Sequence, residues 1–338
     1  MDAQWQEFCD TLLTTGNSLL AAAPDEETRV EGLAYLARVA AYTIERNLLA
    51  QVRMTNGVML GGGGVAGSNP DFRYGSAPID PSKRYLLKGQ MNDAHRVALS
   101  LYTSMPDGGF EVSDFKVFNV GSDELGADGT FEIAVSPEGS PGDGLKAKPT
   151  TNVLLLRDIV LVKNGTRPDY VFEPEEAAES GILFSAPRLL QAFGRIKDLA
   201  GPTEQYLEWS NHFASLPNRL EPIREDFDAK IQGDPESLYF TGYFNLGPNQ
   251  SLHVEVPDME CDYWSFMLAN HWQEPLAQSH LNYRTAVKDA DGVTRIVIAA
   301  RDPGCANWLS TEGRSRGVIW HRRLSANNAD TPICTLRG

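Results

Sequence analysis

Four side chains near the C-terminal end of the sequence are of the types that perform general acid–base catalysis. They are the carboxylate of Asp302, the guanidinium of Arg301, the phenol of Tyr283 and the imidazole of His271. A carboxylate or an imidazole can take a proton, a guanidinium can stabilise the negative charge that develops, and a phenol can orient a substrate hydroxyl. We predict that these four residues form the catalytic centre.

This prediction depends on a β-hairpin that the sequence indicates just before Arg301. Asp291-Gly292 separates two runs rich in β-branched residues, from Tyr283 to Val287 and from Val293 to Ala299, which is a strong hairpin signal. The first residue of one arm would then lie across the ladder from the residue that follows the other arm. The simpler alternative is that Asp302 caps the next turn and pairs with Arg301.

A second group of residues has the types that line a pocket for a hydrophobic small molecule. The predicted substrate-binding residues are Tyr74, Lys88, Trp264, Trp272, Asn307 and Trp308. Aromatic residues are dense in the second half of the chain, and most of them must pack in the core, because an aromatic residue on a strand usually does. The predicted partner is therefore a hydrophobic small molecule, and a homo-oligomer is left open.

The motifs that hold metals, nucleotides or an activated serine are missing. His271, Glu274 and His280 fit neither one helix face nor a known zinc-finger spacing, and the four cysteines form no C-x-x-C pair. The glycines at 61–64 are not followed by G-K-[ST], and neither G-x-G-x-x-G nor G-x-S-x-G occurs. We expect no metal and no cofactor. The glycine-rich stretch 57–68 is either a lid over the site or a surface loop.

Charge and composition limit the partners. The 338 residues carry a formal net charge of −15 and are 42% hydrophobic, so the chain can build a core and repels phosphate backbones and anionic lipid. We expect no nucleic-acid partner. No apolar run approaches the ~18 residues of a membrane span, and the first residues lack the basic and apolar regions of a secretory signal. The prediction is a cytoplasmic protein with no membrane partner.

The hydrophobic periodicity changes along the chain from helical to strand-like. An N-terminal helix with a break at Gly16-Asn17 precedes a longer helix that Asp25 caps, whose predicted apolar stripe is Leu33, Ala37, Ala41, Ile44 and Leu48. The strand 94–103 alternates Val97, Leu99 and Leu101 with Arg96, Ala98 and Ser100, which predicts one solvated face.

Strands follow one another without intervening helices, which favours antiparallel sheets. The predicted strands are 84–89, 94–103, 110–119, 130–136, 153–162, 238–246, 251–256, 263–270 and 317–324. The predicted fold is α+β and β-rich, an antiparallel β-sandwich or barrel-like sheet with N-terminal helices and an inserted helical block. The predicted regions are N-terminal helices and a glycine-rich loop (1–68), a first β region (69–172), a helical insertion (173–235) and a C-terminal β region (236–338).

The chain resembles proteins that carry the domain of unknown function 1214, often found beside domain of unknown function 1254. The matching stretches are E-G-L-A-Y-L-A-R from Glu31 to Arg38, N-P-D at Asn69 to Asp71, Tyr263-Trp264, N-H-W at Asn270 to Trp272, and R-D-P-G with N-W-L between Arg301 and Leu309. The resemblance implies a β-rich fold and a role in processing hydrophobic, including aromatic, compounds in catabolic bacteria. It implies no particular reaction.

Two stretches depart from that resemblance. Residues 272–277 read W-Q-E-P-L-A where relatives often have a serine and an aspartate, and residues 307–314 read N-W-L-S-T-E-G-R where relatives often have an aspartate and a histidine. An acid–base role at those positions cannot be transferred to this chain.

Three functions remain. The first is a cofactor-independent enzyme that acts on an aromatic or other hydrophobic small molecule, a lyase (dehydration, retro-aldol cleavage or loss of a small fragment) or an isomerase. The second is a hydrolase of a hydrophobic substrate, which lacks a nucleophile motif. The third is a non-catalytic ligand-binding or assembly module, which would display an exposed aromatic patch.

Overall fold

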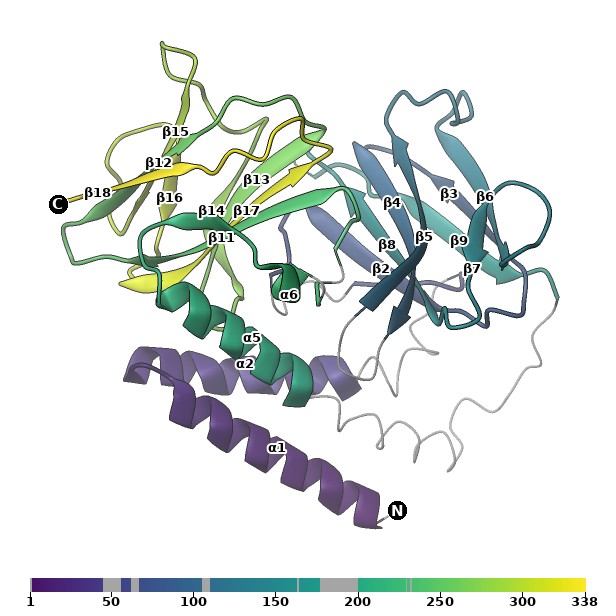
Figure 1. Ribbon diagram of the computed structural model, residues 1–338, viewed down its shortest axis with the longest axis horizontal. Coiled ribbons are helices and arrows are strands. Elements are labelled where there is room, and N and C mark those ends of the chain that lie inside the picture. Colours follow the sequence, from purple (N-terminus) through teal and green to yellow (C-terminus); the bar gives the residue numbers. More distant parts are fainter. Residues whose placement is uncertain are drawn as a thin grey trace.

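The chain folds into two β-sandwiches that lie side by side above a group of helices, as the computed structural model in Figure 1 shows. The structure describes residues 2–44, 56–61, 67–104, 110–162, 164–176, 200–228, 230–231 and 233–338. The predicted stripe residue Leu48, residues 62–66 of the glycine-rich stretch and the first half of the predicted helical block lie outside these residues.

The N-terminal sandwich consists of a five-stranded and a four-stranded sheet. The first has the order β1 (Met59–Leu60), β2 (Phe72–Pro78), β8 (Val153–Ile159), β4 (Arg96–Ser104) and β5 (Phe110–Asn119). The second has the order β7 (Leu145–Ala147), β6 (Thr130–Pro137), β3 (Tyr85–Gln90) and β9 (Asp169–Pro174). One hydrophobic cluster drawn from both sheets fills the space between them.

The C-terminal sandwich repeats this plan. Its five-stranded sheet has the order β10 (Leu220–Pro222), β11 (Ser237–Asn245), β17 (Arg316–Leu324), β13 (Tyr263–Ala269) and β14 (Pro275–Asn282). Its four-stranded sheet has the order β16 (Trp308–Ser310), β15 (Thr294–Ala299), β12 (Ser251–Val256) and β18 (Ile333–Arg337). The prediction of an α+β, β-rich sandwich fold with N-terminal helices and an inserted helix is confirmed.

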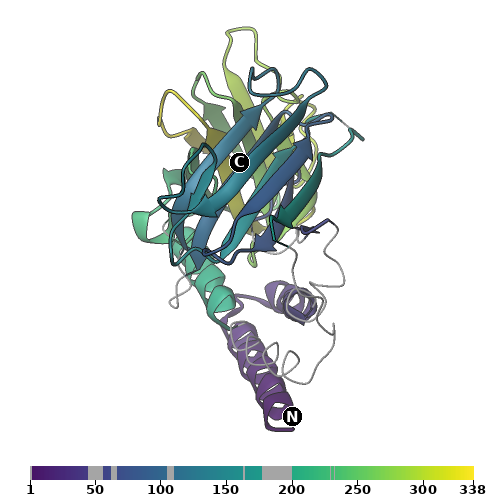
Figure 2. The same ribbon diagram turned by 90° about the vertical axis from the view of Figure 1, so that its right-hand side faces the viewer.

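Helices α1 (Asp2–Ala22) and α2 (Glu26–Ile44) project below the sandwiches, as Figure 2 shows, and α5 (Ala200–Ala214) and the short α6 (Glu225–Asp228) pack on the C-terminal five-stranded sheet. The predicted break at Gly16 is wrong, since α1 continues through it. Asp25 caps α2 as predicted, because its Oδ1 accepts a hydrogen bond of 2.8 Å from the amide of Thr28.

The predicted apolar stripe of α2 is also wrong. Leu33 is 52% exposed, and Ala37 and Ala41 are exposed as well. The buried face is instead formed by Thr28, Gly32, Tyr35 and Val39. Gly32 is required there because a Cβ at this position would lie 2.7 Å from the ring of Trp272. The helix turns its small and aromatic residues, rather than its most apolar ones, toward the sheet.

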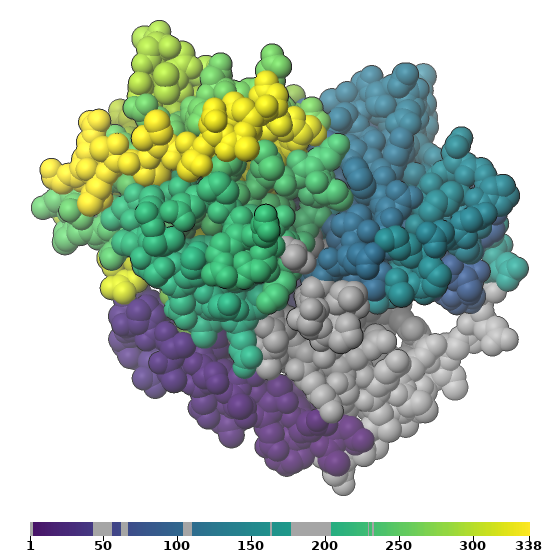
Figure 3. Space-filling model, in the orientation of Figure 1, coloured from purple at the N-terminus to yellow at the C-terminus, as the bar shows by residue number. Residues whose placement is uncertain are grey.

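The two sandwiches meet through the outer faces of their five-stranded sheets, and Figure 3 shows them in contact along one boundary. Phe72 and Ile159 of the N-terminal sandwich pack on Tyr263 and Leu324 of the C-terminal one. The predicted solvated face of β4 is therefore wrong: Arg96, Ala98 and Ser100 are no more than 2% exposed.

Arg96 crosses this boundary as a buried cation. Its guanidinium lies 3.3 Å from a carboxylate oxygen of Asp234, 2.5 Å from Glu236 and 3.2 Å from Asp262, all of which belong to the C-terminal half. A buried charge is tolerated only when such partners compensate it. This cluster therefore holds the two sandwiches in one arrangement.

Arg96→Met should lower the free energy of unfolding by roughly 3–5 kcal/mol, because it leaves three carboxylates at the boundary without their cation. Urea unfolding followed by tryptophan fluorescence measures the change. Lys88→Met is the matched control on a strand of the same sandwich: it breaks an exposed ion pair with Glu132 and should cost less than about 0.5 kcal/mol. Equal losses in both variants would contradict the role given to Arg96.

Candidate functional site

The structure does not bring the four predicted catalytic residues together. The predicted hairpin is wrong, because residues 283–285 form a turn, residues 286–289 lie outside the strands, and β15 pairs with β12 and β16 instead. Tyr283 lies near Thr294 at the start of β15, whereas Arg301 follows its end, about 20 Å further along a six-residue strand. The Asp291-Gly292 turn itself is present, since the Gly292 amide donates to the carbonyl of Asp289.

Arg301 and Asp302 are exposed on the turn after β15. Asp302 Oδ1 accepts a hydrogen bond of 2.7 Å from the amide of Gly304, whose φ of 76° is left-handed. The carboxylate thus caps a turn, which is the simpler of the two roles predicted for it.

His271 is buried, with 3% of its surface exposed, and lies just after β13 at the other end of the C-terminal sheet. Its Nδ1 lies 2.9 Å from the hydroxyl of Tyr243, and its Nε2 makes no hydrogen bond with the described residues. Burial lowers the pKa of His271 to about 4, and the positive charge of Arg316 adds to this effect. The imidazole is therefore neutral near pH 7 and belongs to the contact between the sheet and the helices.

Three predicted substrate-binding residues have their polar atoms engaged in backbone contacts. Trp272 Nε1 donates to the carbonyl of Thr28, and Trp308 Nε1 donates to the carbonyl of Ala299. Asn307 donates to the carbonyls of Val287 and Arg295. Lys88 is 58% exposed and pairs with Glu132 on the far sheet of the N-terminal sandwich. These four side chains are placed as structural or surface groups.

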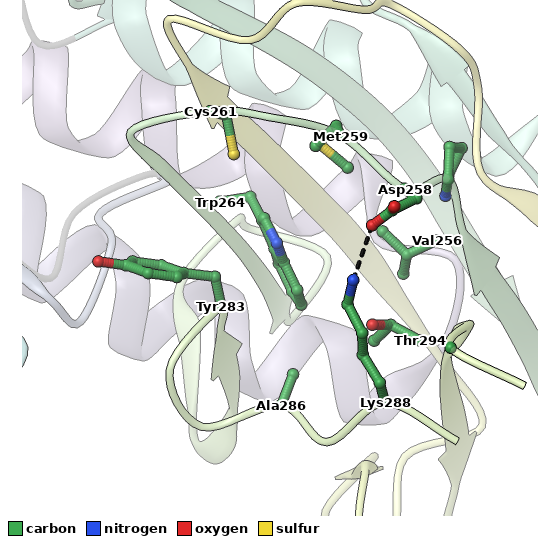
Figure 4. A pocket seen from close by; sticks show the side chains of 11 residues that line it. Val256, Asp258, Met259, Cys261, Trp264, Tyr283, Ala286, Lys288 and Thr294 are labelled. Atoms are coloured by element: carbon green, nitrogen blue, oxygen red, sulfur yellow. Dashed lines mark hydrogen bonds and ion pairs between the residues drawn. The ribbon is translucent and has the colours of Figure 1, made fainter. Parts of the chain in front are cut away.

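Trp264 and Tyr283, by contrast, share a cleft of about 200 Å³ at the open end of the C-terminal sandwich. Figure 4 shows Trp264 and Met259 at its centre, with the ion pair of Lys288 and Asp258 beside them. The Tyr283 hydroxyl points away from that ion pair.

This cleft is lined by both polar and apolar groups, but none of them is prepared for proton transfer. Burial raises the pKa of the Cys261 thiol, which makes it a poor nucleophile. Lys288 and Asp258 neutralise each other at 2.8 Å and are 58% and 81% exposed. The cleft therefore offers space for a small molecule but no group that could act on it by acid–base chemistry.

A richer set of groups lies on the outer face of the C-terminal five-stranded sheet, between α5 and the N-terminal sandwich. Strand pairing aligns Tyr239, Arg322, Ser265 and Asn282 in one row across β11, β17, β13 and β14. Residues two apart on a strand share a face, so Trp320 is in the next row of the same face. The row places a cation between a phenol and a hydroxyl.

Arg322 is the centre of this region. It is 7% exposed, and its guanidinium lies 5.0 Å from the ring centre of Phe72 and 5.2 Å from that of Tyr239. Its Nη2 donates to the carbonyl of Gly67 at 3.3 Å, and its side chain also contacts the hydroxyl of Tyr74. Burial opposes the charge, but an arginine keeps its proton in proteins. Of the predicted binding residues, Tyr74 is thus beside it.

Asp71 organises the polar groups next to Arg322. Its Oδ2 accepts hydrogen bonds from Tyr263 (2.7 Å) and Asn282 (2.9 Å) and lies 3.3 Å from Nε2 of His280. Burial alone would raise the pKa of Asp71, but His280, Tyr263 and Asn282 hold it below its ordinary value. Burial and the charge of Asp71 raise the pKa of Tyr263, so its hydroxyl stays protonated. Asn69 completes the network with Nδ2 contacts to Tyr263 and Ser265.

The carboxylates at this boundary are already committed to other partners. Asp71 is held as described, and the Arg96 cluster holds three more. Among the residues that the structure describes, Arg322 forms no ion pair, and its Nε is buried without an acceptor. This boundary therefore contains a buried cation that carboxylates compensate, Arg96, and at least one, Arg322, that no described carboxylate compensates.

Sequence reasoning missed Arg322 although the sequence carries a signal for it. The predicted last strand, 317–324, reads G-V-I-W-H-R-R-L, with three basic residues inside a run that must be buried. His321 and Arg323 face the sandwich core, where Arg323 Nε donates to His321 Nε2 at 2.8 Å. Arg322 points the other way because side chains alternate along a strand.

No group of three histidine, cysteine or acidic side chains that could hold a metal ion is found within the described ranges. In the same ranges, no helix is long and apolar enough to cross a membrane.

Comparison with known proteins supports the fold. No protein-family model matches the chain, and no curated protein matches it. The crystal structure of an uncharacterized protein from Burkholderia cenocepacia is similar over 99% of this chain and 96% of its own, with a TM-score of 0.89 and 25% sequence identity. The VPA0106 protein from Vibrio parahaemolyticus is similar over 89% of this chain and 96% of its own, with a TM-score of 0.51 and 11% identity. The resemblance to domain 1214 stays a prediction.

The buried imidazole of His271 should make the protein less stable as the pH falls. The unfolded chain takes up its proton near pH 6.5, whereas the folded one takes it up only near pH 4. Between these values the unfolded state binds more protons, so stability decreases by up to ~1.4 kcal/mol per pH unit from this group. Urea unfolding at pH 7.0, 6.0 and 5.0 should give a shallower decrease for His271→Gln than for the natural protein.

Tyr243→Phe is the control for this measurement. It removes the hydrogen bond to His271 but keeps the imidazole buried, so it should lower stability at each pH and leave the slope unchanged. If the free energy of unfolding of His271→Gln fell with pH as steeply as that of the natural protein, the pH dependence would not come from His271.

Proposed function

We propose that the chain is an enzyme that binds a hydrophobic small molecule beside Arg322 and acts on it by general acid–base chemistry, as a lyase or an isomerase. Arg322 stabilises the negative charge that develops on a substrate oxygen, and Tyr74 orients that oxygen. The Asp71–His280 pair takes and returns the proton. The chemistry requires no metal and no nucleotide, and the proposed setting is the cytoplasm.

The observation that carries this proposal is the buried, uncompensated charge of Arg322. A guanidinium without a carboxylate is costly in a fold that only needs stability, because the charge loses its hydration and gains no partner. The same group is useful where negative charge appears during a reaction, since a fixed donor in a dry site stabilises it strongly. A residue whose charge is strongly affected by burial is a candidate for a functional site.

The neighbouring groups suit proton transfer. His280 is 15% exposed and keeps its Nε2 beside the Asp71 carboxylate, which is the arrangement that orients an imidazole base. His280 also lies in the row of Met267 and Trp320, next to the row of Arg322. Strand spacing puts the Cα atoms of His280 and Arg322 about 12 Å apart. Two long side chains at that separation can reach one small molecule.

A ligand-binding or assembly module is the second candidate. An assembly surface would present its aromatic residues to solvent, whereas the rings around Arg322 are buried, so the geometry favours a small-molecule site. A hydrolase is less well supported, because the cleft thiol of Cys261 has a raised pKa.

Incubation in deuterated water tests the proposal. The probes are aryl β-hydroxy ketones and aryl β-hydroxy acids, and proton NMR records product formation or exchange of the α-proton. We expect conversion or exchange with at least one probe, and a loss of roughly 100-fold in Arg322→Met, the cost of removing one oxyanion donor. Arg219→Met is the control, because Arg219 pairs with Glu221 at the edge of the same sheet and is 50% exposed.

If Arg322→Met formed product or exchanged the α-proton as fast as the natural protein, the proposed site would be wrong. Binding of the probes without any exchange or conversion would favour the binding module instead.

A further inference from the structure

We propose that the molecule bound beside Arg322 carries an aromatic body and a permanent carboxylate, which Arg322 and Trp320 bind together. This inference rests on the proposed function and adds the class of substrate to it: the carboxylate oxygens that Arg322 binds are the same atoms on which further negative charge develops when the α-proton is removed.

The first observation is a pair of buried donors without acceptors. Arg322 Nε and Trp320 Nε1 are both inaccessible and make no hydrogen bond to any residue that the structure describes. The two residues are two positions apart on β17 and share its outer face, so their Cα atoms lie about 7 Å apart. Unpaired buried N–H groups are rare in native proteins, because each loses its contact with water and gains nothing. An acceptor-rich ligand would satisfy both.

The second observation is that the described part of the protein offers these donors no acid. Asp71 already accepts from Tyr263 and Asn282, and the acids around Arg96 are held by that arginine. A neutral ligand would leave the charge of Arg322 as it is, whereas a carboxylate would give Arg322 the compensation that Arg96 has. A guanidinium and a carboxylate also match in shape, because both are planar and pair through two parallel hydrogen bonds.

The third observation concerns the body of the ligand. Arg322 is held between the rings of Phe72 and Tyr239, and Trp320 lies edge-on to Tyr239 at 6.0 Å and to Phe213 at 6.2 Å. Rings arranged in this way favour a further aromatic ring over a flexible chain. The ligand class is therefore an aryl carboxylic acid.

Isothermal titration calorimetry with matched probes tests this inference. The probes are benzoate, 4-hydroxybenzoate and cinnamate, each paired with its neutral amide, and phenylphosphonate as a second anion. We expect each acid to bind the natural protein at least 10-fold more tightly than its amide. Arg322→Met should remove this preference, and Trp320→Phe should weaken binding of the acids several-fold while leaving the amides unchanged.

Two further variants make the result interpretable. Arg322→Lys keeps the charge without the planar fork, so it should retain part of the preference, and it serves if Arg322→Met does not fold. Arg219→Met removes an exposed cation just before β10 and should bind like the natural protein.

Equal binding of acids and amides, or a preference that survives in Arg322→Met, would overturn the inference. Tighter binding of phenylphosphonate than of any carboxylic acid would also contradict the inference that the anionic group of the ligand is a carboxylate. Neither result would change the outcome of the exchange experiment with the neutral aryl β-hydroxy ketones, so that part of the experiment tests the proposed enzyme separately.

Discussion

The structure depends on how it handles positive charge that is buried between two β-sandwiches. A guanidinium loses its hydration there, and only carboxylates, hydroxyls or ring faces can replace it. Arg96 receives three carboxylates from the opposite sandwich, so the two bodies are held in register. Arg322 approaches the same boundary from the other side and receives aromatic rings, a carbonyl and a phenol instead. The first arrangement is suited to stability and the second to binding a negative charge.

The fold makes this site by giving its central sheets two buried faces. In each sandwich the five-stranded sheet uses one face for its own core and the other for the boundary, so β13 and β17 are buried almost throughout. Helix α2 docks on the turn after β13 through the Glu31-to-Arg38 stretch: Gly32 makes room for Trp272, and Arg38 binds Glu274 with two contacts of 2.5 Å. Two of the stretches that carry the resemblance, 31–38 and 270–272, therefore attach α2 to this sheet.

The strands could be predicted because period-two patterns and turn glycines are local properties, and 110–119 and 251–256 match β5 and β12 at both ends. Which strands pair with one another is not a local property of the sequence. Residues 283–287 resemble a strand in composition, but the sheet already has β12 and β16 beside β15. Arg96 suggested a solvated face because charged residues are usually exposed, and a second sandwich cannot be inferred from one strand. Arg322 was missed for the same reason, since its uncompensated charge becomes evident only when its neighbours are known.

The central claim is that Arg322 binds the carboxylate of an aromatic acid. A crystal structure with 4-bromobenzoate bound tests it directly, because the anomalous signal of bromine locates the ring without reference to any assumed site. The account predicts bromine density at the boundary of the two sandwiches, with the carboxylate about 3 Å from the Arg322 guanidinium. Bromine density only in the cleft beside Lys288, or an Arg322 paired with a protein carboxylate in the same crystal, would contradict it.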